Sequence, residues 1–165
     1  MENYRFYKKN KQIILTYITL VLLLLNACSS GSLYLMKPID KTYSINSIQV
    51  CETKSSVPIQ LDALIQFRTK LDEFLFSDKH FQKGNDIKME YRCIQAKTPG
   101  VWESDSWGSI GERGESLTFE VKYFNDEGEE LCVINAECKG SKMKNAAERA
   151  ASLIAQFTIN NFKRK

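Results

Sequence analysis

The chain has 165 residues, with 23 Lys and Arg against 20 Asp and Glu, so its formal net charge is +3. Residues 1–27 carry four basic groups and one acidic group, and the other 138 residues therefore have no net charge. Nucleic-acid-binding proteins usually present a basic face, so this balance argues against a nucleic-acid partner. The length of the remainder fits one domain with a normal hydrophobic core.

The N-terminal segment has the three zones of a secretory signal: a basic head, an apolar body and a small-residue exit. Residues 1–11 hold the four basic groups, residues 13–25 are almost wholly apolar, and Asn26-Ala27-Cys28 follows. A helix that spans a bilayer needs ~20 apolar residues, which is longer than this run. A transmembrane anchor is therefore the less favoured alternative.

Leu25-Asn26-Ala27-Cys28 resembles the bacterial lipobox, Leu-x-Ala/Gly-Cys. The resemblance implies cleavage after residue 27, a thioether-linked diacylglycerol on Cys28 and attachment to a membrane through that lipid. A plain secretory signal is the alternative. The residue directly after Cys28 is Ser29, and not the aspartate that resembles an inner-membrane retention signal. We therefore expect attachment to the outer membrane, on its periplasmic side. We expect residues 28–42 to be the lipidated cysteine and a tether.

Residues 43–165 are expected to form the single domain. Alternating apolar residues predict a first strand over 43–51. Pro58 then marks the start of a helix, whose apolar residues recur every three or four positions through Phe76. Further alternation predicts three more strands, over residues 87–94, 117–123 and 131–138.

A hairpin turn and a second helix complete the pattern. Asn125-Asp126-Glu127-Gly128 separates the third and fourth strands and places Gly where a positive φ is needed. The apolar stripe of an Ala-rich helix begins at Met143 and continues through Phe157. The order β-α-β-β-β-α predicts an α+β two-layer sandwich. We expect a four-stranded, antiparallel-rich sheet with both helices on one face.

This order resembles a family of small bacterial envelope lipoproteins of unknown function. The matching features are Ile48-Gln49-Val50, Phe67 with Leu71, the Gly-rich loop at residues 108–114, and Asp126-Glu127-Gly128. The resemblance covers about residues 43–162 and implies the fold and an envelope address. It brings no catalytic residues with it.

The loop over residues 98–115 is the candidate partner-binding segment. Loops of this length without internal structure are uncommon and often functional, and tryptophans supply contact area. The alternative is a long hairpin connection whose tryptophans fold over the sheet edge. Its glycine spacing lacks the G-K-[ST] ending of a phosphate-binding loop. The candidate residues are Trp102, Trp107, Gly108, Gly111, Arg113 and Gly114.

Four cysteines follow Cys28, and an exported chain meets conditions that allow disulfides. Cys132 and Cys138 lie in one predicted strand, ~20 Å apart, too far to bond each other. The predicted topology brings Cys51, Cys93 and Cys138 toward one end of the sheet. We therefore expect one disulfide among these three and a buried thiol at Cys132, or, as the alternative, four thiols that are all buried and reduced.

No constellation of residues predicts catalysis, a metal site or a cofactor. His80 is the only histidine, and the acidic residues near Gly128 lack the spacing of a calcium loop. The leading expectation is a non-catalytic interaction module that binds another envelope protein, within secretion or cell-wall machinery. The alternative is a small-ligand- or lipid-binding periplasmic lipoprotein that uses the sheet face left open by the helices. An enzyme is the least favoured class.

Overall fold

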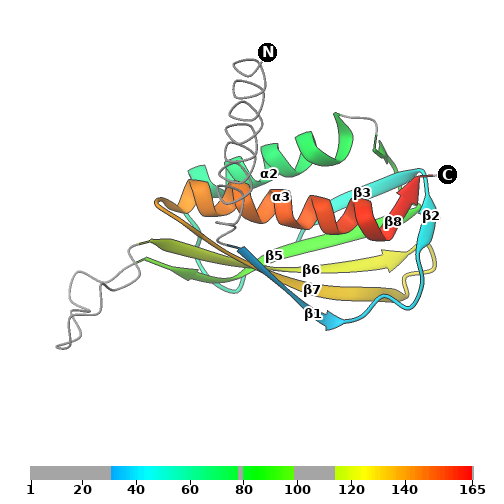
Figure 1. Cartoon of the computed structure of the whole chain (residues 1–165), viewed down its shortest axis with the longest axis horizontal. Coiled ribbons are helices and arrows are strands. Elements are labelled where there is room, and N and C mark those ends of the chain that lie inside the picture. The colour runs from blue at the N-terminus through cyan, green and yellow to red at the C-terminus, as the bar shows by residue number, and fades with distance from the viewer. Residues whose placement is uncertain (1–30, 78–79, 99–113, 165) are drawn as a thin grey trace, which may run out of the picture. The chain divides into compact units, whose positions relative to one another are not determined.

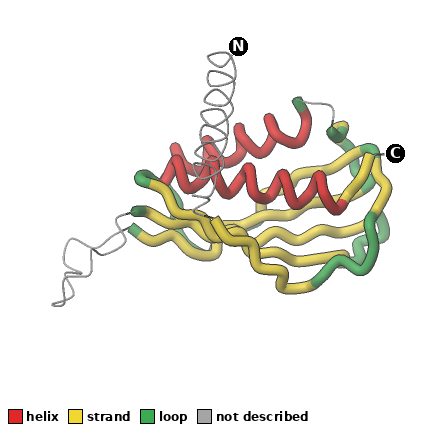
Figure 2. The backbone as a smooth tube through the Cα atoms, in the orientation of Figure 1, coloured by secondary structure: helices red, strands yellow, loops and turns green. Residues whose placement is uncertain are grey.

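A six-stranded sheet with two helices on one face makes up most of the described chain, which comprises residues 31–77, 80–98 and 114–164 of this computed structural model (Figure 1). The helices are α2 (Leu61–Phe76) and α3 (Met143–Asn161). Figure 2 shows both helices on the same side of the strands. The strands are β1 (Gly31–Lys37), β2 (Tyr43–Ile45), β3 (Ser47–Glu52), β4 (Gln82–Lys83), β5 (Ile87–Lys97), β6 (Glu115–Asn125), β7 (Glu130–Gly140) and β8 (Phe162–Arg164).

The strand order in the main sheet is β1-β7-β6-β5-β3-β4. β3 runs parallel to β5 because α2 forms the crossover between them, whereas β5, β6, β7 and β1 pair antiparallel in turn. Gly128, in the turn between β6 and β7, has a φ of 83°, as the hairpin pattern predicts. β2 and β8 form a separate two-stranded parallel pair.

The core lies between the sheet and the two helices. Alternate residues of β5, β6 and β7 are buried on the helix side, as a sheet with one covered face requires. The ring of Phe67 on α2 stacks on Phe119 of β6 with centroids 3.9 Å apart, and Tyr91 of β5 lies beside it at 5.0 Å. Small residues let α3 lie close to the sheet; its fully buried alanines are Ala146, Ala147, Ala150 and Ala151.

The predicted α+β class is confirmed, but the predicted sheet of four strands is too small. β1 adds to β7 at one edge, and the two-residue strand β4 adds to β3 at the other. The tether predicted for residues 28–42 is therefore wrong over residues 31–37, which pair with β7. The compact unit begins at Gly31 rather than at residue 43.

Two element boundaries also differ from the prediction. The helix predicted to start at Pro58 begins at Leu61, directly after Gln60, whose backbone is extended. The strand predicted over residues 43–51 is divided at Asn46, and its first part pairs with β8 instead of joining the main sheet. Within the described ranges, neither helix is long and apolar enough to cross a bilayer.

Candidate functional site

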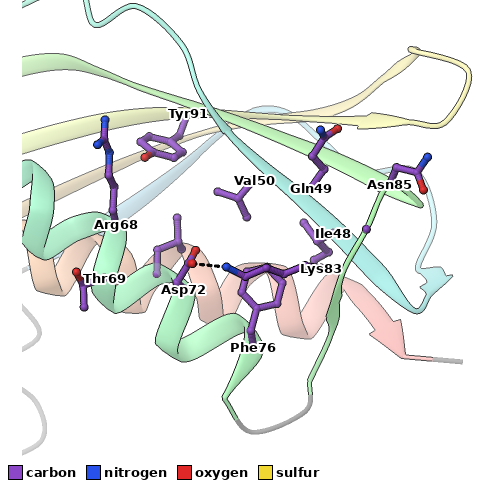
Figure 3. A pocket seen from close by; sticks show the side chains of 12 residues that line it. Ile48, Gln49, Val50, Arg68, Thr69, Asp72, Phe76, Lys83, Asn85 and Tyr91 are labelled. Carbon is purple, nitrogen blue, oxygen red and sulfur yellow. Dashed lines mark hydrogen bonds and ion pairs between the residues drawn. The ribbon is translucent and has the colours of Figure 1, made fainter.

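A cleft of about 660 Å³ lies between α2 and β3, on the helix side of the sheet (Figure 3). One face of α2 forms its outer wall with residues spaced three and four apart, a spacing that aligns side chains along a helix. These residues are Arg68, Thr69, Asp72 and Phe76. Ile48 and Val50 of β3, with Leu71, supply the apolar surface, and Lys83, Gly84 and Asn85 close the end next to β4.

Glu52 organises the polar side of the cleft. Arg68 donates to the Glu52 carboxylate through Nε at 2.6 Å and through its terminal nitrogen, and the Tyr91 hydroxyl donates to the same oxygen at 3.2 Å. Burial, together with the adjacent carboxylate, raises the pKa of Tyr91 to about 12, so the phenol keeps its proton as a donor. The hydrogen bond to Glu52 raises the pKa of Arg68. This arrangement ties α2 to β3 and β5.

A second ion pair stands at the other end of the cleft. The Lys83 ammonium lies 2.7 Å from the Asp72 carboxylate, as the dashed line in Figure 3 shows. Both cationic side chains that line the cleft are therefore paired with carboxylates. The cleft presents an apolar surface between two compensated pairs, which suits an uncharged or apolar segment better than a strongly charged ligand.

The outer edge of β3 is open beside this cleft. β4 pairs only with Ser47 and Ile48, and no other described strand lies beyond β3. The Ile48 carbonyl accepts a hydrogen bond from the Gly84 N–H on this side. Because backbone groups alternate sides along a strand, the N–H and C=O of Val50 point outward too. An open edge of this kind can pair with another extended segment.

The other edge of the sheet is open as well and carries apolar side chains. β1 pairs with β7 on one side only, and no described strand pairs with its second side. Tyr34, Leu35 and Met36 are 51%, 49% and 62% exposed. Leu35 pairs in register with Ile134, which is buried on the helix side, so Leu35 lies on that face at the edge of the sheet. Tyr34 pairs in register with Asn135 and so lies on the opposite face. Exposed apolar side chains at a sheet edge can mark an interaction site.

The predicted loop over residues 98–115 does connect two strands, β5 and β6. Trp102, Trp107, Gly108, Gly111 and Arg113 lie outside the described residues, as does Cys28 of the lipobox. Gly114 is the one candidate of the loop set that is described. It directly precedes β6, where an added Cβ would lie 3.0 Å from the Gly140 carbonyl oxygen. The recognition-loop hypothesis stays a prediction.

The predicted disulfide does not form in the structure, where Cys51, Cys93, Cys132 and Cys138 are all free thiols. Cys51 pairs in register with Glu90 and so lies on the open face, whereas Cys93 and Cys138 are buried on the helix face. β6 separates Cys93 from Cys138, and Cys93 is level with Ala136. Two strand spacings and two residues of offset give about 11–12 Å, beyond the ~4.4–6.8 Å that a disulfide allows.

The open face of the sheet carries ion pairs. Arg92 lies 2.8 Å from Glu120, and Lys88 lies 2.6 Å from Glu90. Glu130, one of the acidic residues near the turn, approaches Lys37 and Lys122 at 3.7 Å. The ligand site that we expected on this face stays a prediction, and the cleft described above lies on the helix side. His80 is half-buried after α2, and nowhere in the described ranges do three or more His, Cys, Asp or Glu side chains gather as metal ligands would.

Sequence reasoning missed both sheet edges and the cleft. The exposed residues Leu61 and Ile65 of α2 were one available signal, because they continue the stripe of Arg68 and Asp72 on a face that the core does not use. The mixed sequence of residues 33–37 was another, with Tyr34 and Met36 too apolar for a flexible tether.

The arrangement defines an α+β sandwich with a mixed six-stranded sheet and two helices on one face. No family model matches the chain, and no curated protein is significantly similar to it. The chain is similar in structure to PelC from Paraburkholderia phytofirmans, solved as a dodecamer, with a TM-score of 0.54 and 9% identity over 82% of this chain and 99% of PelC. A dodecamer of a single-residue variant of the same PelC matches with a TM-score of 0.50 and 9% identity over 78% of this chain and 95% of that one. At this identity the likeness shows the fold alone.

Proposed function

We propose that this chain is a lipid-anchored protein of the bacterial cell envelope whose domain is a non-catalytic interaction module that associates with further copies of itself. The observation that carries the proposal is the pair of open sheet edges, one apolar at β1 and one beside the cleft at β3. Charge, proline or a covering element usually blocks such edges in a protein that stays monomeric. Here Lys37 and Pro38 stand only at the end of β1, and β4 covers only Ser47 and Ile48 of β3. The PelC structures support self-association, because that similarly folded protein assembles as a dodecamer.

The anchor follows from the lipobox at residues 25–28. With β1 beginning at Gly31, only Ser29 and Ser30 separate Cys28 from the sheet. Residues span at most ~3.6 Å each, so a lipid on Cys28 would hold the start of β1 within about 11 Å of the membrane surface. Many copies held at the same distance would meet at matched heights, which favours association between their sheet edges. Ser29 in the position after the cysteine supports the outer membrane as the address.

The experiment combines labelling and recovery. The full chain incorporates a radioactive fatty acid and sediments with outer membranes, whereas Cys28→Ser loses both properties and Cys51→Ser, the matched control, keeps them. Two differently tagged copies, co-expressed and extracted in mild detergent, are recovered together. Labelling that persists in Cys28→Ser contradicts the anchor. Recovery of each tag without the other contradicts self-association.

A second candidate function, binding of a small apolar ligand, is favoured by the size of the cleft. Its volume of about 660 Å³ lies within the range of small-molecule sites, roughly 300–1,000 Å³. A ligand of this kind would remain bound on gentle purification and appear as added mass in native mass spectrometry. Val50→Trp, which fills the cleft, would remove it, whereas the exposed change Gln156→Trp on α3 would not. A mass equal to that of the bare chain contradicts this candidate.

A further inference from the structure

We infer that β1 of one copy adds to the open edge of β3 in the next copy, with Leu35 seated in the cleft between α2 and β3. The inference rests on the proposed function, because it names the partner surface for self-association. Both surfaces belong to the described chain and lie at opposite ends of the same sheet. One copy therefore has both surfaces at once: β1, which adds to a neighbour, and the edge of β3, to which a neighbour's β1 adds.

The strand directions fit this contact. β3 and β5 are parallel, and each step from β5 through β6 and β7 to β1 is antiparallel. β1 therefore runs opposite to β3. A neighbour placed beside the sheet with its strands in the same orientation brings its β1 antiparallel to β3, and antiparallel pairing is slightly the more stable kind.

The side chains fit as well. Leu33 and Leu35 lie on the helix face of β1, since their register partners Ala136 and Ile134 are buried there. Val50 lies on the helix face of β3 and lines the cleft. A strand added at β3 would direct its helix-face side chains into the cleft, where the helix layer leaves the sheet uncovered. The half-exposed Leu35 would leave water and contact the partly exposed side chains of Val50 and Phe76, which line the cleft.

Exposed apolar residues of α2 continue the surface for β1 beyond the cleft. Leu61 and Ile65 are 70% and 52% exposed and share one face of α2 with Arg68 and Asp72. Apolar side chains thus continue along the wall toward the N-terminal end of α2. Because the two edges differ, the contact is heterologous, and repetition closes a ring or extends a chain. A contact between two β1 edges would instead stop at a dimer.

Cysteine cross-linking separates these arrangements. In a Cys51→Ser background, Met36→Cys and Gln49→Cys are made as two separate full-length proteins, extracted in mild detergent, mixed and treated with a short bis-maleimide. Both positions are exposed, so the folds should be unaffected. We expect a covalent dimer only in the mixture. The Cys51→Ser chain alone and a mixture of Met36→Cys with Lys144→Cys, an exposed position on α3, are the controls and should give none.

Leu35→Lys, combined with Met36→Cys, should lower the yield of the mixed dimer at least tenfold, whereas Gln156→Lys adds the same charge on exposed α3 and should not. A dimer formed by Met36→Cys alone, as readily as in the mixture, would overturn the inference in favour of paired β1 edges. Absence of any specific cross-link from a protein that still co-purifies with itself would overturn the inference while leaving the proposed function intact. If the two tagged copies do not co-purify, both the inference and the proposed self-association are contradicted.

Discussion

At the scale of single residues, burial decides what the cysteines can do. Burial raises the pKa of Cys132 to about 12 and that of Cys138 to about 11, and it raises the pKa of Cys93 as well. The thiolate is the reactive form, and with a pKa near 12 its fraction at pH 8 is roughly 10⁻⁴. Cys51, on the open face, is only half-buried. These thiols should therefore differ sharply in reactivity.

We predict that iodoacetamide at pH 8 labels Cys51 in the folded protein at least about 100-fold faster than Cys132 or Cys138. The folded state keeps thiol protons that the unfolded chain loses above a pKa of about 8.5. The stabilisation from these buried thiols is thus complete below that pH and is lost as the pH rises through about 11 and 12. Peptide mapping of the labelled protein measures the rates, and a urea-unfolded sample, in which all four should react, is the control. A disulfide peptide joining Cys93 to Cys138 would contradict the strand register.

The burial of Cys132 could be predicted from the sequence. The faces of the sheet on which Cys51 and Cys93 lie could not. Alternation shows that residues of one strand face two ways, yet it does not show which face of β3 matches which face of β5. That depends on the crossover, which pairs Ile48 with Ile87 and so sets Cys51 opposite Glu90. A single step in register reverses the faces, and no local pattern records that step.

At the scale of elements, β1 is the part that sequence reasoning assigned wrongly. Ser29-Ser30-Gly31-Ser32 is typical of a flexible linker, and Pro38 follows soon after. Pairing with β7 overrides that local preference, because β-strand formation depends more on neighbours than on intrinsic propensity. The long alternating strands β5, β6 and β7 were predictable because each has a buried and a solvated face.

Gly31→Val tests whether β1 is part of the sheet. A Cβ at residue 31 would lie 2.8 Å from the Cys138 sulfur, so a larger side chain should push the start of β1 away from β7. We predict faster hydrogen exchange for β7 amides next to β1, with the amides between β5 and β6 still protected. Ser32→Val changes an exposed neighbour and is the matched control. Equal exchange in both variants would mean that residues 31–37 are a tether after all.

At the scale of the whole molecule, the two faces and the two edges of the sheet have different roles. The helix face holds the core, and the opposite face carries ion pairs such as Arg92–Glu120. Among the strands that the structure describes, none pairs with the outer side of β1, and only the two-residue β4 pairs with the outer side of β3. The order of the strands and helices predicted the two-layer arrangement, because an amphipathic helix must bury its apolar face. The open edges were not predictable, since they arise from which strands come last in the spatial order.

The central claim, that the chain assembles with itself through these edges, is tested most directly by native mass spectrometry of the full-length protein extracted in mild detergent. We predict species of several chains that dissociate on dilution, and a shift to single chains in Leu35→Lys but not in Gln156→Lys, because only the first places a charge in the cleft. Single chains at every concentration in the unchanged protein would contradict the claim.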